Sequence, residues 1–197
     1  MTLILASASP IRSQMLTENH VPHQVVPAHV DEASVKSAML VESALPRDIA
    51  DTLADLKARK LAARYPDSLV LGADQVLVFQ KTLFDKAPDL ATLRDQLIQL
   101  RGQTHELLYA VVIYENANPV WRHIGRAQLT MRPFSDGFLD TYLEIGGDDL
   151  LTTVGGYKLE ADGPTLFSRV QGDYFSVLGM PLLEVLQFLR SRGVLPG

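Results

Sequence analysis

Asp74 is the first side chain in this sequence whose type and place could do chemistry. It follows the apolar run Leu69-Val70-Leu71. An acid at the end of a buried strand lies at the rim of an α/β sheet, where ligands bind. An aspartate that caps a helix or a turn is an equally good interpretation of this residue taken alone.

The adjacent acids Asp31 and Glu32 form a second candidate, in a stretch that is not expected to be regular helix. Two carboxylates side by side could coordinate Mg²⁺ or Mn²⁺, because these ions prefer oxygen ligands. A solvated acidic loop is the commoner meaning of such a pair. The pair therefore supports a metal site only if other residues indicate the same chemistry.

Phosphate binding is the chemistry that a third group of residues could provide. Ser7, Ser9 and Arg12 offer hydroxyl groups, turn amides and a guanidinium that can bind phosphate through two hydrogen bonds. A capped helix with a surface arginine is the alternative. Lys57 and Lys86 could add positive charge, although isolated lysines are usually solvated.

Several other classes of site are excluded by what the sequence lacks. It contains no Gly-x-x-x-x-Gly-Lys-Ser/Thr, no Gly-x-Gly-x-x-Gly and no Gly-x-Ser-x-Gly. Cysteine is absent, so the chain has no disulfide, thiol nucleophile or thiolate metal site. The net charge of -5 and the lack of a long basic cluster argue against nucleic acid as a partner.

Membranes are also unexpected partners. No apolar run approaches the roughly 20 residues that a spanning helix needs. The first residues show neither the basic leader nor the apolar core of a signal peptide, so we expect a cytoplasmic protein.

Alternating apolar runs and amphipathic segments must position these residues. Strands are predicted at 3–6, 23–27, 68–73 and 76–79, with a strand pair at 106–114 and 120–130. Helices are predicted from Pro10 to 16, from Asp48 or Asp51 to 65, and at 90–100, 138–145 and 182–189. Segment 30–46 should be irregular and could include a short helix, and short strands should follow 146–156. This order predicts one α/β domain, residues 1–197, with a mixed, partly antiparallel central sheet flanked by helices.

The order of the motifs resembles that of one known family. The opening 5–12, Leu-Ala-Ser-Ala-Ser-Pro-Ile-Arg, is similar to the signature of the Maf family, the septum-formation-inhibitor proteins. Further matches follow in the family order over essentially the whole chain: Val30-Asp31-Glu32, Leu53 to Ala58, Gly72-Ala73-Asp74-Gln75, Lys86, Leu100 to His105, Gly156 to Glu160 and Gly172 to Leu182.

The resemblance implies a fold with a cleft between two lobes, like that of inosine triphosphatases, and an activity. Members are nucleoside triphosphate pyrophosphatases that use Mg²⁺ or Mn²⁺, release a nucleoside monophosphate and pyrophosphate, and are typically homodimers. Some are connected with septum formation.

The family also implies a role for each matching residue. Asp74 would be the proton acceptor and a metal ligand, and Glu32 would help to hold the metal. The predicted catalytic residues are thus Asp74, Glu32 and Lys57, and the predicted substrate contacts are Ser7, Ser9, Arg12, Lys86 and Glu160.

Some positions depart from the family pattern. Ile11 stands where the pyrimidine-nucleotide branch usually has arginine, and Glu160 stands where that branch tends to have glutamine. The 7-methyl-GTP branch has glutamate there. Thr152 and Thr153 stand where the family usually has an acidic residue, and Ala87 stands where it usually has proline. Two alternatives to a pyrophosphatase stay open. One is a nucleotide-binding regulator of septation with little hydrolysis, and the other is a different α/β enzyme such as a phosphatase or nucleotide transferase.

Overall fold

Seven strands form one mixed sheet in the computed structural model, which describes residues 2–196. The strand order is β2-β1-β3-β5-β6-β7, with β4 paired to the far end of β3. Strand β1 (Thr2–Leu5) is parallel to both β2 (His23–Val25) and β3 (Ser68–Phe79), whereas β4 (Thr82–Phe84) is antiparallel to β3. The predicted fold class, α/β with a mixed, partly antiparallel sheet flanked by helices, is confirmed.

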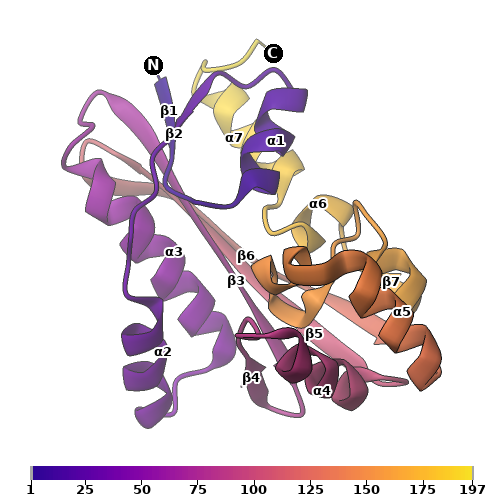
Figure 1. Cartoon of the computed structure of the whole chain (residues 1–197). Coiled ribbons are helices and arrows are strands. Elements are labelled where there is room, and N and C mark those ends of the chain that lie inside the picture. The colour runs from indigo at the N-terminus through magenta and orange to yellow at the C-terminus, as the bar shows by residue number, and fades with distance from the viewer. Residues whose placement is uncertain (1, 197) are drawn as a thin grey trace. The chain divides into compact units, whose positions relative to one another are not determined.

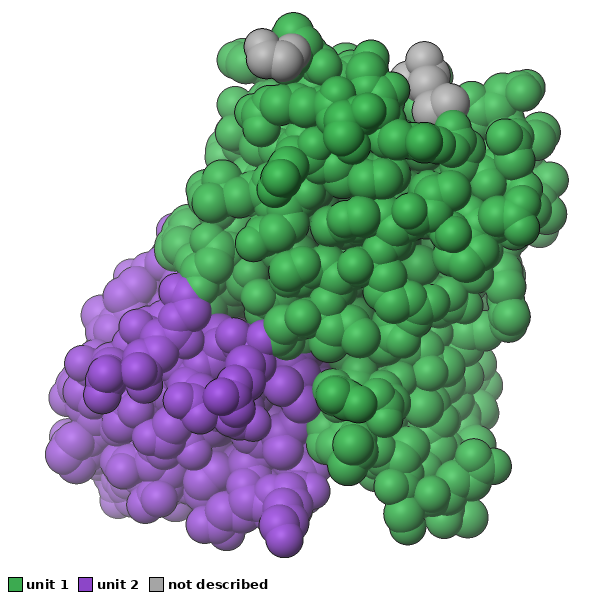
Figure 2. Space-filling view, turned by 180° about the vertical axis from the view of Figure 1, so that it is seen from behind, with its two compact units in different colours: residues 1–75, 109–125, 173–197 green, residues 76–108, 126–172 purple. Residues whose placement is uncertain are grey.

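The chain divides into two compact units, which are coloured separately in Figure 2. Unit 1 comprises Met1–Gln75, Tyr109–Gly125 and Asp173–Gly197, and unit 2 comprises Val76–Leu108 and Arg126–Gly172. Strands β3, β5 (Thr104–Glu115) and β6 (Asn118–Met131) contribute residues to both units.

Unit 1 packs helices on both faces of its part of the sheet (Figure 1). Helices α1 (Pro10–Glu18) and α7 (Leu182–Ser191) share a buried cluster with alternate strand residues such as Leu3, Leu5 and Leu71. The other face receives α3 (Pro46–Ala62), whose Ile49, Leu53 and Ala54 are fully buried. Full burial of each leucine stabilises by about 1.5–3 kcal/mol.

The alternation of side chains along β3 decides what Asp74 can reach. Leu69, Leu71 and Ala73 belong to the cluster with α1 and α7, so Asp74 lies on the opposite face, toward α3. Gly72 shares that face, and a Cβ there would lie 2.2 Å from the Ala54 carbonyl oxygen and 2.7 Å from the Ala58 nitrogen. Glycine at 72 therefore lets the backbone of α3 approach the strand directly beside Asp74.

Unit 2 contains α4 (Leu90–Leu100), α5 (Asp136–Gly146), strand β7 (Phe167–Gln171) and three 3₁₀ segments, Gly147–Thr152, Val154–Gly156 and Gly163–Leu166. Helix α4 begins after Asp89, which accepts a hydrogen bond from the Thr92 amide, and α5 begins after Ser135, which accepts one from Phe138. Strand β7 is antiparallel to the end of β6.

Three local predictions were wrong, and the one for segment 30–46 was right only in part. Strand β3 runs through Asp74 without a break, because the buried carboxylate is paired with a lysine. Helix α3 begins with Pro46 after Leu45, so neither Asp48 nor Asp51 caps it. Segment 30–46 holds the ten-residue helix α2, Glu32–Val41. Between residues 156 and 196 the only strand is β7, since 3₁₀ turns and the short helix α6 (Tyr174–Val177) take the place of further strands.

None of the helices between residues 2 and 196 combines the length and the hydropathy that a bilayer span requires.

Candidate active site

Lys57 joins the two acids that the sequence singled out. Its Nζ lies 2.6 Å from Asp74 Oδ1 and 2.7 Å from Glu32 Oε1. The three residues come from α3, β3 and the first turn of α2, respectively. Glu32 and Asp74 therefore share one site in unit 1, as a common catalytic role requires.

Helix capping places Glu32 at this site. Asp31 caps α2: its Oδ1 accepts a hydrogen bond from the Ser34 amide and its Oδ2 accepts one from the Ser34 hydroxyl. These bonds lower the pKa of Asp31. Both oxygens of Asp31 are thus used in the cap, and Glu32 is the acid of the pair that faces the site.

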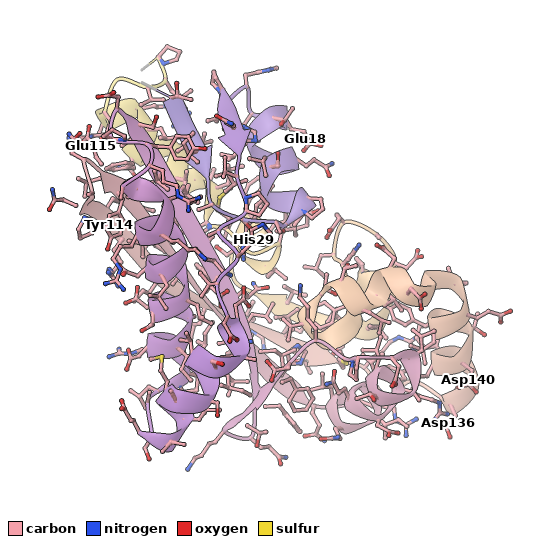
Figure 3. The ribbon with its side chains drawn as sticks, turned by 60° about the vertical axis from the view of Figure 1, so that its left-hand side comes forward. Glu18, His29, Tyr114, Glu115, Asp136 and Asp140 are labelled. Carbon is pink, nitrogen blue, oxygen red and sulfur yellow. The ribbon has the colours of Figure 1, made fainter. Side chains whose placement is uncertain are left out.

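The loop before α2 is held from α3 as well. Lys60 donates a hydrogen bond of 2.8 Å to the carbonyl of His29, a residue with φ of 47° that Figure 3 labels in this loop. Lys57 and Lys60 lie on one helix three residues apart, so α3 contacts the Glu32 segment at two points.

Asp74 is the most deeply buried acid of this site. Its residue is 5% exposed, and its Oδ2 is buried without a hydrogen-bond partner among the described residues. Burial raises the pKa of Asp74, an effect that Lys57 opposes and Glu32 reinforces. A carboxylate with one oxygen unpaired in a low-dielectric site is a poor structural element but a good acceptor for a proton or a metal ion.

Arg12 lies in the same electrostatic environment and is buried, so its interpretation as a surface arginine was wrong. Its Nε donates to the Gly179 carbonyl at 2.9 Å, and its Nη1 donates to Ser7 Oγ at 3.1 Å and to the Ala73 carbonyl at 2.8 Å. Burial lowers the pKa of Arg12, whereas the charges of Asp74 and Glu32 raise it. Two cations, Arg12 and Lys57, thus face two anions, and the site is formally neutral.

Ser7 and Ser9 form the turn before α1, as predicted. Ser9 occupies the N-cap position ahead of Pro10, but its side chain makes no capping hydrogen bond. Instead the Ser9 amide donates to Ser7 Oγ at 3.2 Å. The turn is therefore held by Ser7, which also accepts from Arg12.

A segment near the C-terminal end of unit 1 also contacts the residues on either side of Asp74. Gln75 Nε2 donates to the carbonyls of Ser176 at 3.0 Å and Val177 at 3.2 Å, on the face of β3 opposite Asp74. Asp173 accepts hydrogen bonds from the amide and hydroxyl of Ser176 and so caps α6.

Comparison with known proteins identifies the family of this chain. The model of the family described as Maf-like protein matches residues 2–192. The chain belongs to the Maf family.

Relatives in this family are similar over their whole length. A nucleoside triphosphate pyrophosphatase of Ruegeria pomeroyi is 53% identical over 193 residues, covering 98% of this chain and 97% of that protein. Its namesake in Roseobacter denitrificans is 50% identical over 98% of both chains. Among solved structures, a HAM1 protein from Coxiella burnetii aligns with 68% of this chain and 74% of its own, at a TM-score of 0.43 and 14% identity, which is too distant to bear on function.

The predicted Maf residues are divided between the two units. Ser7, Arg12, Glu32, Lys57 and Asp74 are brought together in unit 1. Lys86, which follows β4, and Glu160 are both exposed and belong to unit 2. Their predicted contacts with substrate stay predictions.

Sequence reasoning expected a tight turn at Gly179 but did not identify the partner of Gly179 or of Gln75, although both lie within matching motifs. Gly179 has φ of 105°, and a Cβ there would lie 3.1 Å from Arg12 Nη2. The need for glycine beside a guanidinium was a usable signal. The partners of Gln75 are backbone carbonyls about a hundred residues away, which no local pattern reveals.

The Maf site fits a hard divalent cation. Glu32 and Asp74 provide carboxylate oxygens, and Asp74 Oδ2 is a buried acceptor that still needs a donor or a cation. Residues 2–196 hold no group of three or more His, Asp or Glu side chains arranged as a metal site. Two protein carboxylates suit Mg²⁺ or Mn²⁺, because such ions take their remaining ligands from water and substrate phosphates.

Proposed function

We propose that this Maf protein hydrolyses a nucleoside triphosphate to the nucleoside monophosphate and pyrophosphate, with a divalent cation bound at Glu32 and Asp74. Its relatives at 50% and 53% identity over nearly the whole chain carry the name nucleoside triphosphate pyrophosphatase, which supports the reaction. The observation that carries the proposal is the buried Asp74, paired on one oxygen with Lys57 and unpaired on the other.

Each residue of the site has a chemical task in this reaction. A water oxygen bonds to phosphorus, the bridging bond between the α- and β-phosphates breaks, and pyrophosphate leaves. Asp74 accepts the proton of that water, since burial has raised its affinity for protons. Mg²⁺ or Mn²⁺, when bound, supplies positive charge to the phosphates and makes a coordinated water more acidic.

Positive side chains complete the site. A triphosphate repels an attacking water, so catalysis of phosphoryl transfer consists mainly of positioning and charge neutralisation. Lys57 has a flexible stem and provides a mobile positive charge, whereas Arg12 is fixed by three hydrogen bonds. Arg12 therefore holds the Ser7 turn beside Ala73 of β3 and adds a constant positive potential beside the phosphates.

The base of the substrate and the assembly state are finer parts of the proposal. Glu160 is exposed and negatively charged, which would favour a cationic base such as 7-methylguanine over a neutral one. We also propose a cytoplasmic homodimer, as is typical of the family, which light scattering on the purified protein would test.

The decisive assay separates orthophosphate from pyrophosphate. Canonical nucleoside triphosphates, pyrimidine nucleotides and 7-methyl-GTP are incubated with enzyme and Mg²⁺ or Mn²⁺, and both products are quantified. Stoichiometric pyrophosphate supports the proposal. Orthophosphate alone would identify a phosphatase, and tight nucleotide binding without product would identify a regulator.

Asp74→Asn tests the assignment of the proton acceptor. Turnover should fall about 100-fold or more, the usual contribution of a general base. Asp140→Asn makes the same chemical change at an exposed residue of α5, labelled in Figure 3, and should keep full activity. Circular dichroism and melting curves check that both variants are folded. Full turnover in folded Asp74→Asn would refute the role of Asp74.

A further inference from the structure

Lys57 occupies the position that a divalent cation would take between the two carboxylates. Its ammonium group contacts Glu32 Oε1 and Asp74 Oδ1 within 2.7 Å, and its side chain is only 11% exposed. Asp74, with a side chain that is 7% exposed, carries its negative charge in a poorly solvated place and requires a nearby cation. In the absence of other ligands, Lys57 supplies that charge.

We infer that Lys57 is a tethered counter-ion that competes with the divalent metal for Glu32 and Asp74. This inference rests on the proposed function only in assigning the metal to these two acids. An ammonium and a divalent ion that contact the same carboxylate oxygens repel each other strongly in a site of low dielectric constant. Metal binding therefore displaces Lys57 from at least one carboxylate.

The displaced ammonium group can bind the triphosphate tail of the substrate. The lysine stem has four flexible carbons and its head group is a point charge, so it can change partners without moving α3. Asp74 Oδ2 has no hydrogen-bond partner among the described residues, so a cation that binds it breaks no existing hydrogen bond. Lys57 thus weakens metal binding in the free protein and strengthens phosphate binding in the complex.

Metal binding without nucleotide is the direct test. Mn²⁺ is titrated into the wild-type protein and into Lys57→Met, with bound and free Mn²⁺ distinguished by electron paramagnetic resonance. We expect Lys57→Met to bind Mn²⁺ between about 5-fold and 150-fold more tightly than wild type, the usual range for coupling between two competing or cooperating ligands. The same variant should lose turnover.

Two matched variants control for charge and for structure. Arg59→Met removes a positive charge from an exposed residue of the same helix and should bind Mn²⁺ like wild type. Lys57→Arg keeps the charge and should also show the weak binding of wild type. Addition of Asp74→Asn to Lys57→Met should abolish the gain, because it removes a ligand.

The gain can also be measured through stability if Lys57→Met folds poorly. A ligand that binds only the native state stabilises it by RT ln(1 + [L]/Kd), so at one ligand concentration tighter binding gives a larger rise in melting temperature. Mn²⁺ should therefore raise the melting temperature of Lys57→Met, or of the more polar Lys57→Gln, more than that of wild type. Unchanged or weaker Mn²⁺ binding in these variants would overturn the inference. It would leave the proposed reaction intact, because that reaction is judged by pyrophosphate release.

Discussion

Acidification should destabilise this protein through His105, a buried side chain of β5. The residue is 1% exposed, its Nε2 lies 2.7 Å from the Tyr157 hydroxyl, and its Nδ1 is buried without a partner among the described residues. The rings of Tyr157 and Phe167 pack against it. Burial lowers the pKa of His105 from 6.5 to about 4.

The sign and size of the effect follow from proton linkage. Between pH 6.5 and about 4 the unfolded chain binds a proton at His105 and the folded chain does not, so stability falls as the pH is lowered through this window. The difference between the two pKa values corresponds to roughly 3 kcal/mol in full, at about 1.36 kcal/mol for each pH unit. Between pH 8 and pH 5 the loss should be roughly 2 kcal/mol.

Urea unfolding at a series of pH values between 5 and 8 measures this loss. Other groups titrate too, and Asp74, whose pKa is raised, contributes in the opposite direction, because its stabilisation is lost as the pH rises. Subtracting the free energy of unfolding of His105→Gln from that of wild type at each pH removes these shared contributions. That difference should change by roughly 2 kcal/mol from pH 8 to pH 5.

A further variant identifies the cause. Tyr157→Phe removes the hydrogen bond to Nε2 but keeps the ring that buries His105, so it should retain the pH dependence. A difference curve between wild type and His105→Gln that is flat over this range would refute the argument that burial controls the protonation of His105.

Two structural predictions concern unit 1. Gly179→Ala should destabilise by about 1–3 kcal/mol and lower turnover, because alanine is strained at φ of 105° and its Cβ would press on Arg12. Gly193→Ala, with φ of 68° but no atom within 4 Å of the added Cβ, should keep turnover, and equal kinetics for the two variants would contradict the reasoning. Arg122→Met should destabilise by about 1–2 kcal/mol in chemical unfolding, since Arg122 pairs with Asp51 and Asp55, whose side chains are only 20% and 19% exposed. Arg126→Met, which removes a 3.4 Å pair at a 67% exposed side chain, should change stability by less than about 0.5 kcal/mol, and an equal loss in both arginine variants would show that burial of the partner acids is irrelevant.

Local patterns predicted the elements whose stability is local. Helix α4 spans Leu90–Leu100 as its leucine spacing indicated, because Leu93, Leu97 and Leu100 form one buried stripe. The β5–β6 hairpin was also predicted, and its turn has Asn116 and Ala117 at φ of 49° and 60°. The spacing of apolar residues and the residue types of turns are sufficient to predict such elements, because the interactions that stabilise them lie within a few residues.

The errors occurred where a distant partner decides. Sequence reasoning ended a strand at Asp74, because an unpaired charge is not tolerated inside a sheet. Lys57, seventeen residues earlier, provides the pairing that lets β3 continue. Likewise, the burial of Arg12 depends on distant acceptors, which include the Gly179 carbonyl, 167 residues away. Single-sequence patterns contain neither contact.

The choice of site residues, in contrast, depended on resemblance more than on pattern. Asp74 and Glu32 were each ambiguous in isolation, and the family motif joined them before any geometry was known. The structure adds the ion pairs by which Lys57 connects them, and an Asp74 Oδ2 that has no hydrogen-bond partner among the described residues. It also separates Asp31, whose two oxygens are committed to Ser34, from the adjacent Glu32.

The buried charged side chains of unit 1 are better explained by an exchange of Lys57 for a metal ion than by a contribution to stability. Replacing a buried ion pair by apolar side chains is often neutral or stabilising, so a pair such as Lys57 and Asp74 is weak evidence of structural need. Arg12 illustrates the contrast, because its hydrogen bonds go to neutral carbonyl and hydroxyl oxygens that will not leave. Both ion pairs of Lys57 described above are with carboxylates, and a divalent ion could take over those same oxygens. A fixed arginine beside an exchangeable lysine lets the site stay neutral when empty and still offer both a metal position and a mobile cation when a polyphosphate arrives.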